Sequence, residues 1–119
     1  MNTHRLKTYS AESGYVYQYY FLEAQPRRRF WGRSGTAYLF RVSGDRKSYT
    51  VVEVLVEEAA LQAWETAHGR ALAGAEQYAA AKMGLLRAMD QSAGPQHLRQ
   101  ARVDAANIDS LLDPLHLDD

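Results

Sequence analysis

The sequence contains no cysteine, which excludes disulfides, thiolate metal sites and cysteine nucleophiles. It also has no apolar run long enough to cross a membrane, and its first residues lack the apolar stretch of a signal peptide. We therefore expect a cytoplasmic protein with no membrane partner. Arginine outnumbers lysine and alanine is abundant, a bias typical of GC-rich bacterial genomes, so we expect a bacterial source.

The motifs of several enzyme classes are missing as well. Gly32, Gly35 and Gly44 do not combine with the lysine and hydroxyl of a phosphate-binding loop, and no Gly-x-Ser-x-Gly turn is present. The histidines are too dispersed to indicate a metal site. We expect no metal and no cofactor, and we interpret the chain as non-catalytic.

The composition is that of an ordinary globular protein. The chain has 119 residues, of which 46% are hydrophobic and 24% charged. A chain of this length buries about two thirds of its unfolded surface, enough for a core without disulfides or metals. We expect one domain over residues 1–119. Whether residues 1–12 and 107–119 form flexible ends is an open alternative.

The net charge of zero conceals two unlike halves. Residues 1–50 carry nine Lys or Arg and three acids, net +6, and residues 51–119 carry five against eleven, net −6. The basic half could meet an anionic partner, or the two halves, or two subunits, could attract each other. We favour mutual attraction.

Aromatic residues with a period of two predict a strand over residues 15–23. Tyr15, Tyr17, Tyr19 and Phe21 share one face, and the other face is nearly as apolar, so one helical layer would leave one side uncovered. Residues 36–42 and 49–56 predict two further strands, joined by short connections. An extra strand at 29–31 is an open alternative.

Helical spacing begins at Glu57. One helix should end at Gly69, and a longer one should follow from about 70 to 90, with small residues that allow close packing. Residues 95–106 predict a weak helix. The fold class is therefore α+β: a three- or four-stranded antiparallel meander, two helices and a short helical or irregular C-terminal segment.

The chain has eight tyrosines, and its predicted strand and long helix have apolar residues on more than one side. This apolar surface is more than one chain can cover. A symmetric dimer is the simplest source of covering material. The leading interpretation is a homodimeric interaction or accessory protein that acts through its aromatic sheet face or leucine-rich C-terminus. A protein partner fits this interpretation.

Two alternatives depend on local residues. The first is nucleic-acid binding, in which guanidinium groups contact phosphates and aromatic rings stack on bases. Its residues form one basic-aromatic run: Arg27, Arg28, Arg29, Phe30, Trp31 and Arg33. The second alternative is a small-molecule site between the sheet and the long helix. Its candidates are His68, Arg70, Glu76, Tyr78 and Lys82.

Overall fold

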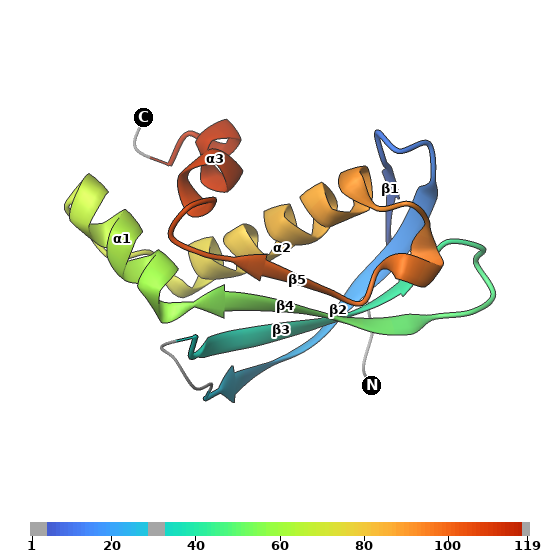
Figure 1. The fold of residues 1–119 in the computed structure, drawn as a ribbon, viewed down its shortest axis with the longest axis horizontal. Helices are drawn as coiled ribbons and strands as arrows, with labels where there is room; N and C mark the ends of the chain where they lie inside the picture. The colour runs from blue at the N-terminus through green and yellow to red at the C-terminus, as the bar shows by residue number, and fades with distance from the viewer. Residues whose placement is uncertain (1–4, 29–32, 118–119) are drawn as a thin grey trace.

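The structure is a computed structural model that describes residues 5–28 and 33–117 (Figure 1). It contains one five-stranded mixed sheet with strand order β1-β2-β3-β4-β5. The strands are β1 (Lys7–Ser10), β2 (Val16–Arg27), β3 (Gly35–Ser43), β4 (Thr50–Glu57) and β5 (Gln100–Val103). The first four strands form an antiparallel meander, and β5 pairs with β4 in parallel. The α+β class is thus confirmed.

The strand count and the uniformly antiparallel pairing were predicted wrongly. The short edge strands β1 and β5 are absent from the prediction, and β5 lies within the stretch 95–106 that was predicted as a helix. Only Pro95–His97 is helical there, as a single 3-10 turn. Pairing of β5 with β4, which places Val103 beside Val56, outweighs the weak local preference for helix.

Three α-helices accompany the sheet: α1 (Glu58–His68), α2 (Gly74–Gln91) and α3 (Ile108–Leu112). A 3-10 turn over Asp113–Leu115 follows α3. Gly69 ends α1 as predicted, since it adopts a left-handed φ of 79° and its N–H donates to the Glu65 carbonyl at 2.8 Å. None of the described helices is long and apolar enough to cross a bilayer.

One face of the sheet carries the core. Figure 1 shows α2 and α3 on the same side of the sheet. Gly84 lets α2 lie close to β4 and β5, because a Cβ built there would lie 3.0 Å from Val103 Cγ2 and 3.4 Å from Val54 Cγ1. The fully buried side chains of this core include Tyr17, Phe40, Val52, Val54 and Val56 from the sheet and Leu85 and Met89 from α2.

The opposite face of the sheet, called the open face below, carries Tyr20, Leu39, Val51 and Glu53. No described helix lies over it, so the single helical layer leaves one side of the sheet without a helix. Val51 keeps 46% of its surface exposed, whereas Tyr20 is half-buried against Tyr49, with ring centroids 6.0 Å apart. The open face is therefore only partly covered, since Ala37 and Leu55 on it are buried but Val51 is not.

Candidate functional site

The basic-aromatic run is described only in part. Arg29, Phe30 and Trp31 lie outside the described residues, whereas Arg27 ends β2 and the exposed Arg33 precedes β3. Arg28, between these segments, is exposed.

Arg27 lies on the open face, where its Nε donates to Glu53 Oε1 at 3.2 Å. It reaches that face because the register of β2 shifts between Phe21 and Glu23, which reverses the alternation of side chains in the rest of the strand. One arginine of the predicted nucleic-acid site therefore has an acidic partner on β4. Nucleic-acid binding stays a prediction.

The five predicted ligand-binding residues separate into two groups. His68, Arg70 and Glu76 lie where α1 meets α2 and the C-terminal segment, whereas Tyr78 and Lys82 face a different pocket. We call the first region the α1–α3 junction, and it also contains the side chains of Trp64 and Asp109. We call the second region the cationic pocket.

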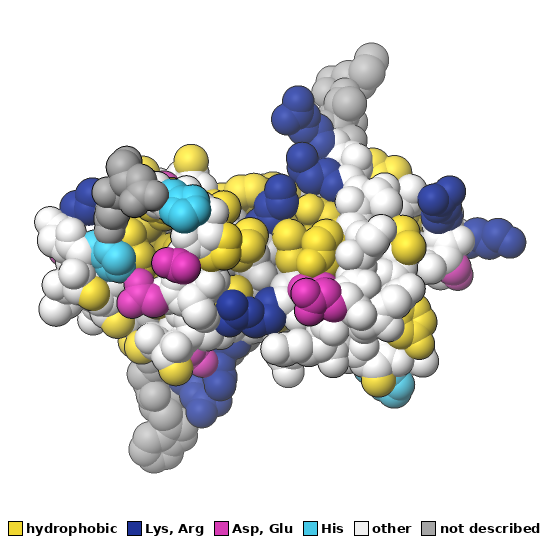
Figure 2. All heavy atoms as spheres, turned by 90° about the horizontal axis from the view of Figure 1, so that it is seen from above, with side chains coloured by type: hydrophobic (Ala, Val, Ile, Leu, Met, Phe, Trp, Pro, Cys, Tyr) yellow, Lys and Arg dark blue, Asp and Glu magenta, His cyan; other side chains and the backbone are white. Residues whose placement is uncertain are grey.

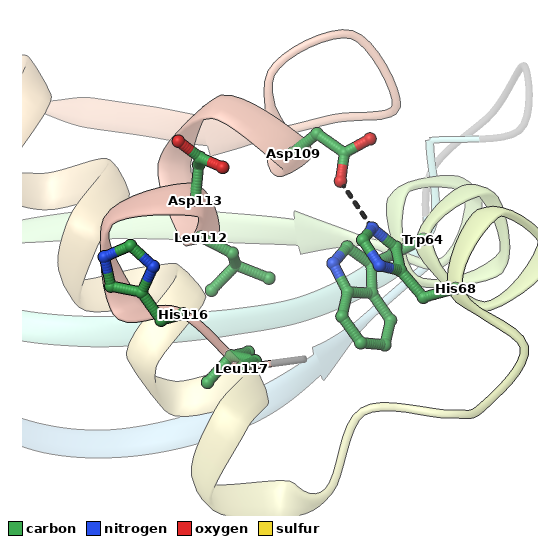
Figure 3. A pocket seen from close by; sticks show the side chains of 7 residues that line it. All are labelled: Trp64, His68, Asp109, Leu112, Asp113, His116 and Leu117. Carbon is green, nitrogen blue, oxygen red and sulfur yellow. Dashed lines mark hydrogen bonds and ion pairs between the residues drawn. The ribbon is translucent and has the colours of Figure 1, made fainter. Parts of the chain in front are cut away.

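At the α1–α3 junction, the His68 ring is held on two sides (Figure 3). It stacks on the buried Trp64 ring, with centroids 4.1 Å apart and an interplanar angle of 14°. Its Nε2 lies 2.8 Å from Asp109 Oδ1 of α3. These contacts tie α1 to α3 across a cavity of about 120 Å³, lined by Trp64, His68, Asp109, Leu112, Asp113, His116 and Leu117.

Arg70 connects the same region to the start of α2. Its two Nη atoms donate to the two carboxylate oxygens of Glu76, each at 2.9 Å, and its guanidinium lies 5.1 Å from the centroid of the Trp64 ring. Glu76 also accepts the Ala73 N–H at 2.8 Å. The Arg70 guanidinium, followed by this backbone bond, lowers the pKa of Glu76 from 4.5 to about 2.

These contacts indicate a structural role for the α1–α3 junction. Its cavity is smaller than the roughly 300–1,000 Å³ of ordinary ligand sites. The described residues that line it include no hydroxyl, thiol or amine that His68 could activate as a nucleophile. Nor do any three described His, Asp or Glu side chains gather closely enough to hold a metal ion.

The cationic pocket lies between the β1–β2 edge of the sheet and α2, with a volume of about 420 Å³. Its lining comprises Arg5, Lys7, Tyr19, Tyr20, Phe21, Tyr78 and Lys82. Lys7 enters it because β1 pairs with β2 so that Lys7 lies directly beside Tyr19, and directly paired residues of antiparallel strands share a face. Arg5, two residues before β1 begins, also lines the pocket.

Aromatic rings form the wall of the cationic pocket. Phe21 meets Tyr78 edge to face, with centroids 5.1 Å apart and an interplanar angle of 76°, and it meets Phe40 at 5.6 Å and 60°. Phe40 is fully buried, whereas Phe21 and Tyr78 are only half-buried. The cluster thus ends at the pocket with two incompletely covered rings.

The chain matches no known family model, and no curated protein or solved structure is significantly similar to it. The geometry of the two regions therefore carries the functional argument.

The three cations of the pocket have no acidic partner among the described residues. Ion pairs elsewhere in the described chain involve basic side chains outside this pocket, including Arg27, His68, Arg70 and Arg102. Figure 2 shows basic side chains gathered beside hydrophobic surface in the upper middle of the view. A cavity edged by positive charges and walled by apolar rings concentrates anions.

Tyr78 and Lys82 lie one helical turn apart, a spacing that would let the lysine ammonium lower the pKa of the tyrosine. The pKa of Tyr78 is instead raised, because the side chain is partly buried. Burial, and then the nearby Tyr78, raise the pKa of Tyr19 in the same way. Both hydroxyls stay protonated near neutral pH, and neither has a hydrogen-bond partner among the described side chains and backbone.

Sequence reasoning missed Arg5, Lys7, Tyr19 and Phe21 as members of this site. The period-two aromatic pattern placed Tyr19 and Phe21 on one face, but it could not indicate which ring meets α2. Arg5 and Lys7 carried no signal, because β1 is too short to be predicted and only its pairing with β2 brings them to the rings.

Proposed function

We propose that the protein binds a small organic anion in the cationic pocket. The observation that carries this proposal is the grouping of Arg5, Lys7 and Lys82, without acidic partners among the described residues, around an aromatic-walled cavity of about 420 Å³. That volume lies within the usual range of ligand sites. The pocket's location between the β1–β2 edge of the sheet and α2 supports the proposal, because one interpretation of the sequence is a small-molecule site between the sheet and the long helix.

The proposal concerns binding rather than catalysis. The described residues that line the pocket include no carboxylate and no histidine, the usual general acids and bases. Lys7 and Lys82 supply compact positive charges, and Arg5 supplies a guanidinium that matches a carboxylate or phosphate with two parallel hydrogen bonds. The neutral hydroxyls of Tyr19 and Tyr78 add two donors.

The test is a titration of organic carboxylates and phosphates, followed by amide chemical shifts in NMR spectra at low salt. We expect perturbations centred on residues 5–7, 19–21 and 78–82. Lys82→Met keeps the apolar stem but removes the charge, and it should weaken binding about fivefold or more, given the usual strength of hydrogen bonds to charged groups.

Lys47→Met is the matched control, because it removes the same charge from the exposed β3–β4 loop. It should leave the affinity unchanged. The proposal fails if no organic anion shifts these residues, or if both variants weaken binding equally.

A second proposal concerns self-association, and the uncovered open face supports it. Tyr20, Leu39 and Val51 present a partly apolar surface there, with no described helix above it. We propose that two copies pair through this face, as the leading interpretation of the sequence expects. In light scattering at high concentration, the wild type should be a dimer and Val51→Asp a monomer. A wild type that stays monomeric refutes this proposal.

A further inference from the structure

The aromatic cluster at the cationic pocket is incomplete on one side. Its inner rings, Phe40 and Tyr38, are buried, and each has aromatic neighbours in tilted or edge-to-face contact. Its outer rings, Phe21 and Tyr78, remain half-buried and border the cavity. Another flat ring placed in the cavity would extend the same packing and cover these two surfaces.

The charges lie beside these rings rather than apart from them. Lys82 follows Tyr78 by one helical turn, so the two side chains occupy neighbouring positions on α2. Lys7 is paired directly with Tyr19 across β1 and β2. A ligand with its ring against Phe21 would therefore hold its acidic group at the basic rim without a long spacer.

We infer that the ligand of the cationic pocket is a flat aromatic ring that carries an oxyanion, either a carboxylate or a phosphate. This inference rests on the proposed function. It adds that the ring contributes to affinity separately from the charge: the oxyanion meets Arg5, Lys7 and Lys82, and the ring meets Phe21 and Tyr78.

Other small molecules would use only part of the site. An inorganic anion would leave the rings uncovered, and a neutral aromatic molecule would leave the three cations unpaired. An aliphatic acid would fill the volume, but it lacks the quadrupole that favours edge-to-face contact with Phe21 and Tyr78. The comparison that isolates the ring is therefore between an aromatic acid and its saturated counterpart.

The experiment compares 2-naphthoate with decahydro-2-naphthoate by calorimetry at low salt. The two acids share one charge and a similar carbon skeleton, but only the first has a flat π-system. We expect the aromatic acid to bind about three- to tenfold tighter, the factor that corresponds to aromatic-pair energies. 2-Naphthyl phosphate should also bind tighter than inorganic phosphate, and its affinity relative to 2-naphthoate identifies the preferred oxyanion.

The outcomes separate this inference from the proposed function. Equal affinities of 2-naphthoate and its saturated counterpart overturn the aromatic preference but leave anion binding intact. Failure of every acid to bind at the pocket overturns both. Binding of neutral 2-naphthamide as tightly as 2-naphthoate overturns the role assigned to the cations.

Two variants locate the effect. Phe21→Leu removes one half-buried ring but retains apolar volume and leaves Tyr78 in place, and it should reduce the preference for the aromatic acid. Lys82→Met should weaken both acids by the same factor and so preserve their ratio. Tyr15→Leu, which removes a partly exposed ring that does not line the pocket, is the control and should change neither affinity. A Phe21→Leu protein with native amide dispersion and an unchanged preference contradicts the inference.

Discussion

The α1–α3 junction and the cationic pocket combine similar side chains but differ in how their charges are satisfied. At the junction, Arg70 lies over the Trp64 ring and its guanidinium is paired with Glu76. In the cationic pocket, Lys82 lies near the aromatic rings without an acidic partner among the described residues. Charges that are paired within the chain stabilise the fold, whereas cations held together without a partner favour an anion from outside.

The largest expected effect tests the packing of the junction. Trp64 is 2% exposed, so Trp64→Ala should lower the free energy of unfolding by about 3–5 kcal/mol, the usual loss for a buried tryptophan. Urea denaturation measures it. Trp64→Phe should lower the free energy of unfolding by less, and it replaces Trp64→Ala in the test if the alanine variant does not fold. A loss below about 1 kcal/mol for Trp64→Ala would show that the junction is not a packing centre.

A matched pair of arginine substitutions tests the contrast between paired and unpaired charge. Arg70→Met should lower the free energy of unfolding by about 1 kcal/mol, because the side chain is 41% exposed and solvent weakens its bond to Glu76. Arg5→Met should change stability by less than about 0.5 kcal/mol, since Arg5 has no described partner. Urea midpoints provide both values, and equal effects would remove the distinction between the two regions.

The pH dependence of stability sharpens the same contrast. The pKa of Glu76 is lowered from 4.5 to about 2 in the folded protein, so ionised Glu76 stabilises the fold above pH 4.5. This contribution is lost as the pH falls from 4.5 toward 2. Thermal melting of the wild type and Glu76→Gln should therefore differ most above pH 4.5 and converge near pH 2. A difference that is constant over this range would contradict the ionic role of Glu76.

The smallest expected effect lies in the cationic pocket. The double variant Lys7→Met/Lys82→Met removes two like charges that have no described partner. We expect the free energy of unfolding to rise by roughly a few tenths of a kcal/mol at low salt. This gain should shrink at high salt because exposed charges are screened. Urea unfolding at two ionic strengths measures this change. A clear loss of stability would mean that the lysines hold the fold rather than a ligand.

The sequence predicted the long elements of the fold better than the short ones. The aromatic alternation of residues 15–23 and the helical spacing after Glu57 are repeated several times, so local pattern identifies β2, α1 and α2. β1 and β5 have four residues each, and their pairing with β2 and β4 decides their conformation. The start of α2 was also misplaced, because Glu76 caps Ala73 and the helix begins at Gly74 instead of about residue 70.

The candidate site was predicted in fragments for the same reason. Tyr78 and Lys82 were identified because one helical turn separates them, which a sequence displays directly. Their partners on β1 and β2 lie far away in the sequence, and only the sheet and the packing of α2 bring them together. His68, Arg70 and Glu76 are close in sequence as well, but their role at the junction depends on Asp109 of α3, which no local pattern indicated.

The parallel pairing of β5 with β4 has a consequence for synthesis. Both α1 and α2 lie between these strands in the chain, so the ribosome completes the whole meander and two helices before residues 100–103 emerge. Throughout that interval β4, with Val52, Val54 and Val56, presents an unpaired apolar edge. Such an edge readily recruits strands from other chains. Nascent chains that stall before residue 100 should therefore be a source of aggregation and a target for chaperones.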